Sequence, residues 1–139
     1  MKSILCTTIG VIGSGIAAIF GGWDVSLQCL LWFMAIDYAS GLVVAGVFHK
    51  SGKTESGSLE SRAGFKGLCR KCAILALVLM AHYLDMVIGG NFVRDAVCIG
   101  FIANEGLSIL ENVGLMGVSY PDAIRKALDV LTKKYEQDN

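Results

Sequence analysis

The chain has 139 residues, of which 54% are hydrophobic and 17% are charged, with a formal net charge of zero. Soluble domains usually carry about 25% charged residues, so this composition argues against an ordinary soluble domain. The five cysteines are an odd number, which argues against a secreted disulfide framework.

Four apolar stretches predict an all-α membrane protein with about four transmembrane helices. They lie near residues 3–20, 25–48, 72–88 and 96–113, and a spanning helix needs about 20 residues. We therefore expect a transmembrane domain over residues 1–120. A short amphipathic helix should follow over residues 121–139 on the cytoplasmic side.

The first stretch has two interpretations. Lys2 precedes it, and residues 15–17 loosely resemble the small-x-small site of a cleaved signal peptide. The apolar run continues past this site to Phe20, which favours a retained transmembrane helix.

The second stretch contains a single charged residue, Asp37. Asp37 shares a helical face with Ser40, Gly41 and Ala45, and small residues permit close helix approach. This face is expected to form a subunit contact or a pore position, or else an internal contact with the fourth stretch.

The segment 49–71 carries eight of the 24 charged residues and leads into the third stretch. Cys69 and Cys72 have CxxC spacing, but no second such pair and no nearby histidine pair complete a metal site. Near the outer end of the third stretch, His82 precedes Asp85 by one turn. This pair is compatible with a proton relay or with an ordinary interfacial pair.

The fourth stretch is a marginal span, because a carboxylate facing lipid costs about 2.5–3.5 kcal/mol. Its polar side chains fall within an arc of roughly 120° on a helix: Asn104, Glu105, Ser108, Glu111 and Asn112. Such a stripe must face protein or water. It is expected to line an interface or a lumen, or to hold a monomeric four-helix bundle together.

The basic residues predict the topology. With four spans and a cytoplasmic start, all of the 12 lysines and arginines except Arg94 fall on the cytoplasmic side. Both termini are therefore expected in the cytoplasm. The helix from Pro121 is expected to expose its charged face to water, or to lie on the membrane surface. Because topology accounts for the basic residues, no nucleic-acid partner is expected.

The residue patterns do not predict catalysis. No nucleophile–base pair, phosphate-binding loop or metal-ligand cluster has suitable spacing. We expect no enzymatic activity, no catalytic residue, no metal and no cofactor.

Three segments carry a family resemblance: DYASG at 37–41, SRAGFKGL at 61–68 with Lys71, and NEGLSILEN at 104–112 with Gly117 and Pro121. They resemble the elements D-Y-x-[ST]-G, S-x-x-G-x-x-G-L and N-E-x-x-S-I-x-E-N of the phage holin family, which includes toxin-secretion holins. The match covers about residues 30–131.

The resemblance implies a small, multi-pass protein of the bacterial host cytoplasmic membrane. Such proteins form homo-oligomers in the lipid bilayer and open lesions that release an endolysin or a secreted toxin. The expected intramembrane polar, oligomer or pore contacts are Asp37, Ser40, Asp85, Asn104, Glu105, Ser108, Glu111 and Asn112. Gly41, Gly64 and Gly67 are expected to allow close packing or turns.

Two other functions compete with a holin. Intramembrane carboxylates also suit a subunit of an ion or small-solute channel or transporter. A membrane adaptor would instead bind a cytoplasmic partner through the charged loop and the tail.

Overall fold

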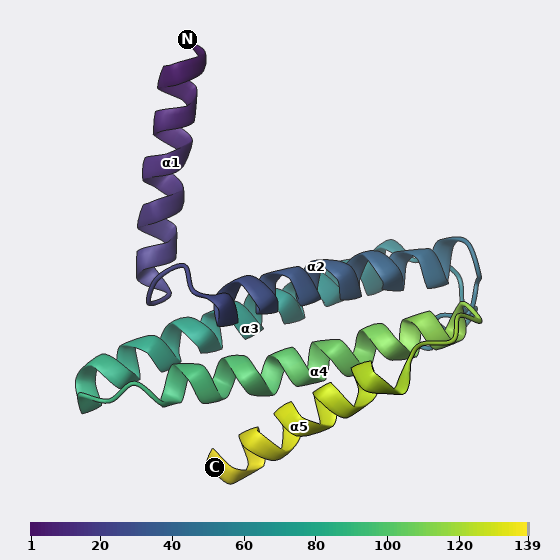
Figure 1. The fold of residues 1–139 in the computed structure, drawn as a ribbon. Helices are drawn as coiled ribbons and strands as arrows, with labels where there is room; N and C mark the ends of the chain where they lie inside the picture. Colours follow the sequence, from purple (N-terminus) through teal and green to yellow (C-terminus); the bar gives the residue numbers. More distant parts are fainter. Residues whose placement is uncertain (139) are drawn as a thin grey trace.

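The computed structural model describes residues 1–138, and it confirms the predicted all-α fold (Figure 1). The helices are α1 (Lys2–Ile19), α2 (Val25–Gly46), α3 (Ser61–Ile88), α4 (Val93–Leu115) and α5 (Asp122–Asp138). No strand occurs within the described residues. Each helix from α1 to α4 is long and apolar enough to cross a membrane. The chain is therefore a multi-pass membrane protein.

Local chemistry explains two of the helix ends. Asp24 caps the start of α2, because its carboxylate accepts a hydrogen bond of 2.9 Å from the Leu27 amide. α3 ends at Gly89, which adopts a left-handed conformation with φ of 77°. Glycine occupies this conformation at no steric cost. The chain then reverses and enters α4.

α3 begins at Ser61, well before the apolar stretch predicted from residue 72. Residues 61–71 are thus helical and pack on α2. A Cβ atom at Gly67 would lie 3.5 Å from Tyr38 Cε2, and one at Gly64 would lie 3.4 Å from the Tyr38 hydroxyl. Gly64 and Gly67 therefore lie where α3 contacts Tyr38 of α2, and their role in close packing or in a turn stays a prediction.

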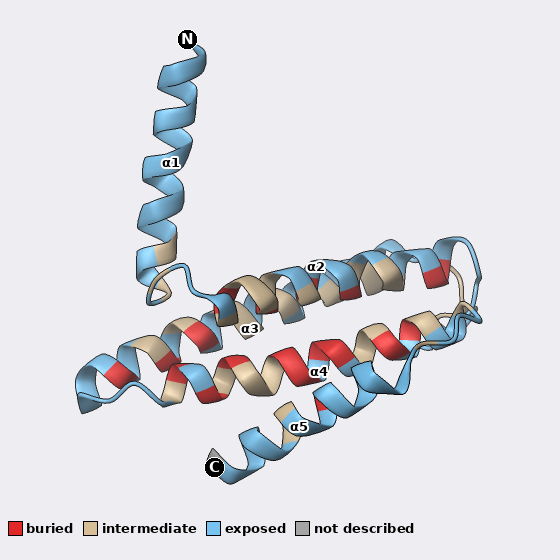
Figure 2. Cartoon of the chain, viewed as in Figure 1, coloured by how far each residue is buried: buried red, intermediate tan, exposed pale blue. Residues whose placement is uncertain are grey.

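Helices α2, α3 and α4 lie side by side around a small core (Figure 1). The core residues are Leu27, Leu30, Met34, Val78, Cys98 and Ile102. Many large apolar side chains are exposed instead, including Trp32, Met80 and Val87. Figure 2 shows burial concentrated along α4. An apolar exterior of this extent is suited to hydrocarbon as the surrounding medium.

α1 projects away from the other helices (Figure 1) and contains no buried residue. A Cβ atom added at Gly10, Gly13 or Gly15 would meet nothing within 4 Å. The helix is therefore free to be covered by lipid along its length. Its retention in the mature protein stays a prediction.

α5 folds back along α4 in the opposite direction. Leu128 is 5% exposed, and a Cβ atom at Gly106 would lie 2.5 Å from its Cδ2. A Cβ atom at Gly100 would lie 2.7 Å from Tyr135 Cε2. Residues 128–135 thus lie beside the middle of α4. The predicted tail helix is confirmed as a helix, its cytoplasmic location stays a prediction, and residue 139 lies outside the described residues.

Candidate functional site

A buried ion cluster joins the three packed helices. Lys71 Nζ on α3 donates to Asp37 Oδ2 on α2 at 2.8 Å and to Glu105 Oε2 on α4 at 2.6 Å. The side chains of Lys71, Asp37 and Glu105 are 14%, 7% and 5% exposed, respectively. We name these three residues the ion cluster.

The ion cluster makes two mid-span carboxylates tolerable. An unpaired charge at the centre of a membrane costs about 2.5–3.5 kcal/mol on insertion scales, and a buried charge is retained when it is paired and hydrogen-bonded. The early start of α3 brings Lys71 level with both carboxylates. With both carboxylates ionised, the cluster carries one net negative charge.

Asn112 extends the ion cluster along the contact between α2 and α4. Its amide donates to the Asp37 carbonyl and to Asp37 Oδ1, both at 3.3 Å, and to Ser40 Oγ at 2.9 Å. A Cβ atom at Gly41 would lie 3.8 Å from the same amide nitrogen. The Asp37 face therefore contacts α4 within the chain, and a subunit contact or a pore position of this face stays a prediction.

A cavity of about 430 Å³ opens beside the ion cluster. All five residues of the predicted polar stripe on α4 line it, as do the three residues of the ion cluster and the charged residues Lys53, Glu60 and Arg70. Asn104 and Glu111 are exposed, whereas Glu105 and Asn112 are buried. The stripe therefore faces this cavity, and the opposite face of α4 receives α5.

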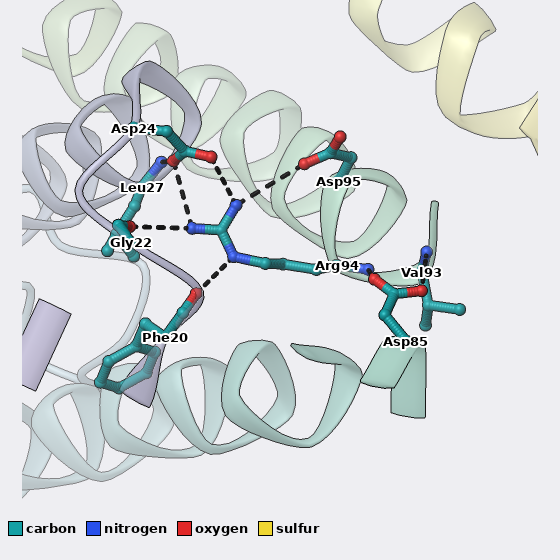
Figure 3. A network of polar contacts seen from close by, with 8 residues as sticks. All are labelled: Phe20, Gly22, Asp24, Leu27, Asp85, Val93, Arg94 and Asp95. Carbon is teal, nitrogen blue, oxygen red and sulfur yellow. Dashed lines mark hydrogen bonds and ion pairs between the residues drawn. The ribbon is translucent and has the colours of Figure 1, made fainter. Parts of the chain in front are cut away.

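Arg94 ties the connection between α1 and α2 to the start of α4 (Figure 3). Its guanidinium donates to Asp24 Oδ2 at 2.7 Å and to Asp24 Oδ1 at 3.1 Å, a bidentate pair. It also donates to the carbonyls of Phe20 and Gly22 and lies 3.6 Å from Asp95 Oδ1. The hydrogen bond from Arg94 holds the pKa of Asp24 below its ordinary value.

Asp85 lies at this same end of the bundle, apart from the ion cluster. Its carboxylate accepts hydrogen bonds from the backbone amides of Val93 at 3.0 Å and Arg94 at 2.9 Å. It therefore satisfies two amides at the start of α4 that have no partner within the helix. The His82 ring packs edge-on against Tyr83, with centroids 5.4 Å apart. Both interpretations of His82 and Asp85, an ordinary interfacial pair or a proton relay, stay open.

From the sequence, Arg94 is only a topology marker and Lys71 is a topology marker that also accompanies the motif at 61–68. The structure gives both residues a structural role. A signal for Lys71 was present, because an intramembrane carboxylate requires a partner and Lys71 borders the third apolar stretch. For Arg94 the signal was its position as the one basic residue predicted outside, with Asp24 in the neighbouring turn. Neither signal identifies which carboxylate the cation meets.

The arrangement links α2, α3 and α4. Its groups are one ammonium, two carboxylates, an amide and a hydroxyl, all joined by hydrogen bonds. Among the described residues, no group of three or more histidine, cysteine or acidic side chains is placed to hold a metal ion.

Comparison with known proteins places the chain in a family. Residues 14–133 match the model of the bacteriophage holin family.

The uncharacterized protein Lmo0128 of Listeria monocytogenes is 37% identical over 93% of this chain and 89% of its own length. An uncharacterized 14.9 kDa protein of Clostridium perfringens is 34% identical over 88% of this chain and 89% of its own length. The uncharacterized protein YqxH of Bacillus subtilis is 34% identical over 86% of this chain and 79% of its own length. No solved structure matches the chain. The chain belongs to the bacteriophage holin family.

Proposed function

We propose that the chain is a holin that forms homo-oligomers in the bacterial cytoplasmic membrane and opens lesions there. The lesions would release an endolysin or a secreted protein, and both termini would lie in the cytoplasm. The observation that carries this proposal is the ion cluster, placed where α2, α3 and α4 meet in the middle of candidate spans.

The ion cluster suits a protein whose helices move from a packed bundle to the border of a water-filled lesion. In the compact chain, Lys71 pairs with both carboxylates. If the helices separate to border a water-filled lesion, the same groups are hydrated. An apolar core would instead lose its burial in water. The ion cluster itself is therefore compatible with both surroundings.

The exterior of the bundle supports assembly in the membrane. α1 has no buried residue, and α2 and α3 expose large apolar side chains such as Trp32 and Met80. Asn104 and Glu111 are exposed on a candidate span, where polar groups require protein or water as a neighbour. Neighbouring copies of the chain would supply apolar contacts for the exposed apolar side chains and polar or hydrated contacts for Asn104 and Glu111.

Vesicle leakage tests the proposal. Purified chain is reconstituted in vesicles that contain a small dye together with a folded fluorescent protein. A holin releases both markers once the chain exceeds a threshold density. Release of the dye alone would instead support a selective channel, and release of neither would contradict lesion formation.

A further inference from the structure

The outer face of α5 is charged along the length that lies on α4. The exposed charged residues of α5 are Asp122, Arg125, Lys126, Asp129, Lys133, Lys134 and Glu136. Its inner face carries Leu128, which packs on Gly106, and Tyr135, which packs on Gly100. Leu131 also packs against the core. We call this arrangement the seated state of α5.

The seated state conflicts with lipid around α4. Gly100 and Gly106 lie near the centre of α4 (Val93–Leu115), which is a candidate span. A helix seated at these positions therefore lies level with the middle of the span. Its outer charges would then point into hydrocarbon, where charged side chains are strongly disfavoured. The seated state thus requires water on the outer side of α5.

In the seated state, α5 also covers part of the surface by which α4 can contact other helices. A side chain at residue 106 would overlap Leu128, because the Cβ atom alone would lie 2.5 Å from Leu128 Cδ2. α5 therefore approaches α4 closely, in the way that small residues allow. While α5 is seated, neither lipid nor another helix reaches this part of α4.

We propose that α5 is a removable cover of α4, and that it must leave α4 before a lesion can open. In the released state α5 lies on the aqueous side of the membrane, and α4 is surrounded by lipid and other helices. The coupling of release to lesion opening rests on the proposed function. The seated and the released states of α5 differ in whether α5 contacts α4, and this difference does not depend on the proposed function.

Cysteine labelling follows α5 directly. In a chain whose five native cysteines are replaced, Leu128→Cys is compared with Val130→Cys, which is the matched control. Leu128 is 5% exposed and Val130 is 65% exposed on the same helix. Inside-out membrane vesicles, taken as the protein accumulates, are treated with a water-soluble maleimide. In the seated state, Leu128→Cys should react at least about tenfold more slowly than Val130→Cys, because exposure controls access to the thiol.

The labelling ratio should change with lesion opening. As the vesicles become permeable to a folded protein, the Leu128→Cys rate should rise to within about twofold of the control. If Leu128→Cys stays protected while folded protein escapes, α5 remains seated in the lesion and the proposal is wrong. Equal rates for the two variants before any leakage would also overturn it, since the seated state would not be populated in the membrane.

A reversible lock tests whether release is required. Gly106→Cys and Leu128→Cys, combined in the cysteine-replaced chain, place two sulfurs within reach of one another, given the contact between these positions. The oxidised pair should lower the release of folded protein at least about tenfold, and reduction should restore it. Equal release from the oxidised and reduced forms would overturn the proposal.

The two readouts separate this proposal from the holin function. If no form of the chain releases folded protein, the proposed function fails. A rise in Leu128→Cys labelling during accumulation would still show that α5 leaves α4.

Discussion

Lys71 and Glu105 meet at 2.6 Å across the contact between α3 and α4. Lys71 lies within the charged first part of α3, before its apolar stretch, whereas Glu105 lies midway along α4. The pair therefore sets how far α3 is displaced along its axis relative to α4. Asp37 on α2 accepts from the same ammonium group, so one lysine aligns three helices.

Replacing Lys71 by methionine should destabilise the bundle by about 3–5 kcal/mol, because two buried carboxylates lose their cation. Unfolding of the purified chain in detergent micelles measures the change. Lys66→Met is the matched control, since Lys66 is exposed on the same helix, and it should change stability by less than about 0.5 kcal/mol.

Neutralising the partners should rescue the Lys71→Met variant. Asp37→Asn and Glu105→Gln remove both unpaired charges while keeping side-chain size, so most of the lost stability should return. A triple variant as unstable as Lys71→Met alone would show that charge pairing is not what Lys71 provides.

Asn112→Ala should cost about 1–3 kcal/mol, because the amide donates to two oxygens of Asp37 and to the Ser40 hydroxyl. Asn104→Ala on the same helix serves as the control. Asn104 is exposed, and its loss should change stability by less than about 0.5 kcal/mol. Equal effects of the two substitutions would contradict the position of Asn112 between α2 and α4.

Gly67→Leu should destabilise the contact between α2 and α3 by about 1–3 kcal/mol through overpacking against the Tyr38 ring. Gly13→Leu makes the same chemical change in α1, where a Cβ atom meets nothing within 4 Å. Both substitutions gain the same helix propensity, so the difference between their unfolding midpoints isolates the crowding. No difference would contradict the close approach of α3 to Tyr38.

Asp24→Asn should weaken the bundle at neutral pH and have little effect in acid. Asparagine still caps a helix well, so the variant mainly removes the charge that Arg94 binds. The folded pKa of Asp24 is lowered, first by the hydrogen bond from Arg94. Its stabilising contribution is therefore complete above the ordinary aspartate pKa of about 3.9 and is lost as the pH falls through the lowered folded pKa.

Thermal melting of the Asp24→Asn variant and the unaltered chain between pH 7 and acid measures this contribution. The two melting temperatures should converge as Asp24 becomes protonated. A gap that stays constant down to low pH would mean that the carboxylate charge does not contribute through Arg94.

The four helices that are long and apolar enough to cross a membrane could be predicted, because hydropathy reports on each helix separately. The start of α3 at Ser61 could not, since residues 61–71 carry four charges and lie outside the apolar stretch that hydropathy detects. The sequence likewise identifies Asp37 and Glu105 as groups that require partners. Their shared partner, Lys71, depends on the rotation and axial displacement of three helices, which no single segment encodes.

The contacts of Asp85 and of α5 could not be predicted from the sequence for similar reasons. Asp85 lies at the right place to bind the start of α4 only because the turn after Gly89 reverses the chain. The amphipathic pattern predicts α5 as a helix. It does not reveal that the apolar face covers Gly100 and Gly106 of α4.

Lysis of living bacteria tests the central claim most directly. The chain is expressed together with a cytoplasmic peptidoglycan hydrolase that lacks any export signal, and culture turbidity is followed. We predict an abrupt loss of turbidity only when both proteins are present. Continued growth of cells that hold both proteins, with the chain verified in the membrane and the hydrolase active in extracts, would contradict a holin.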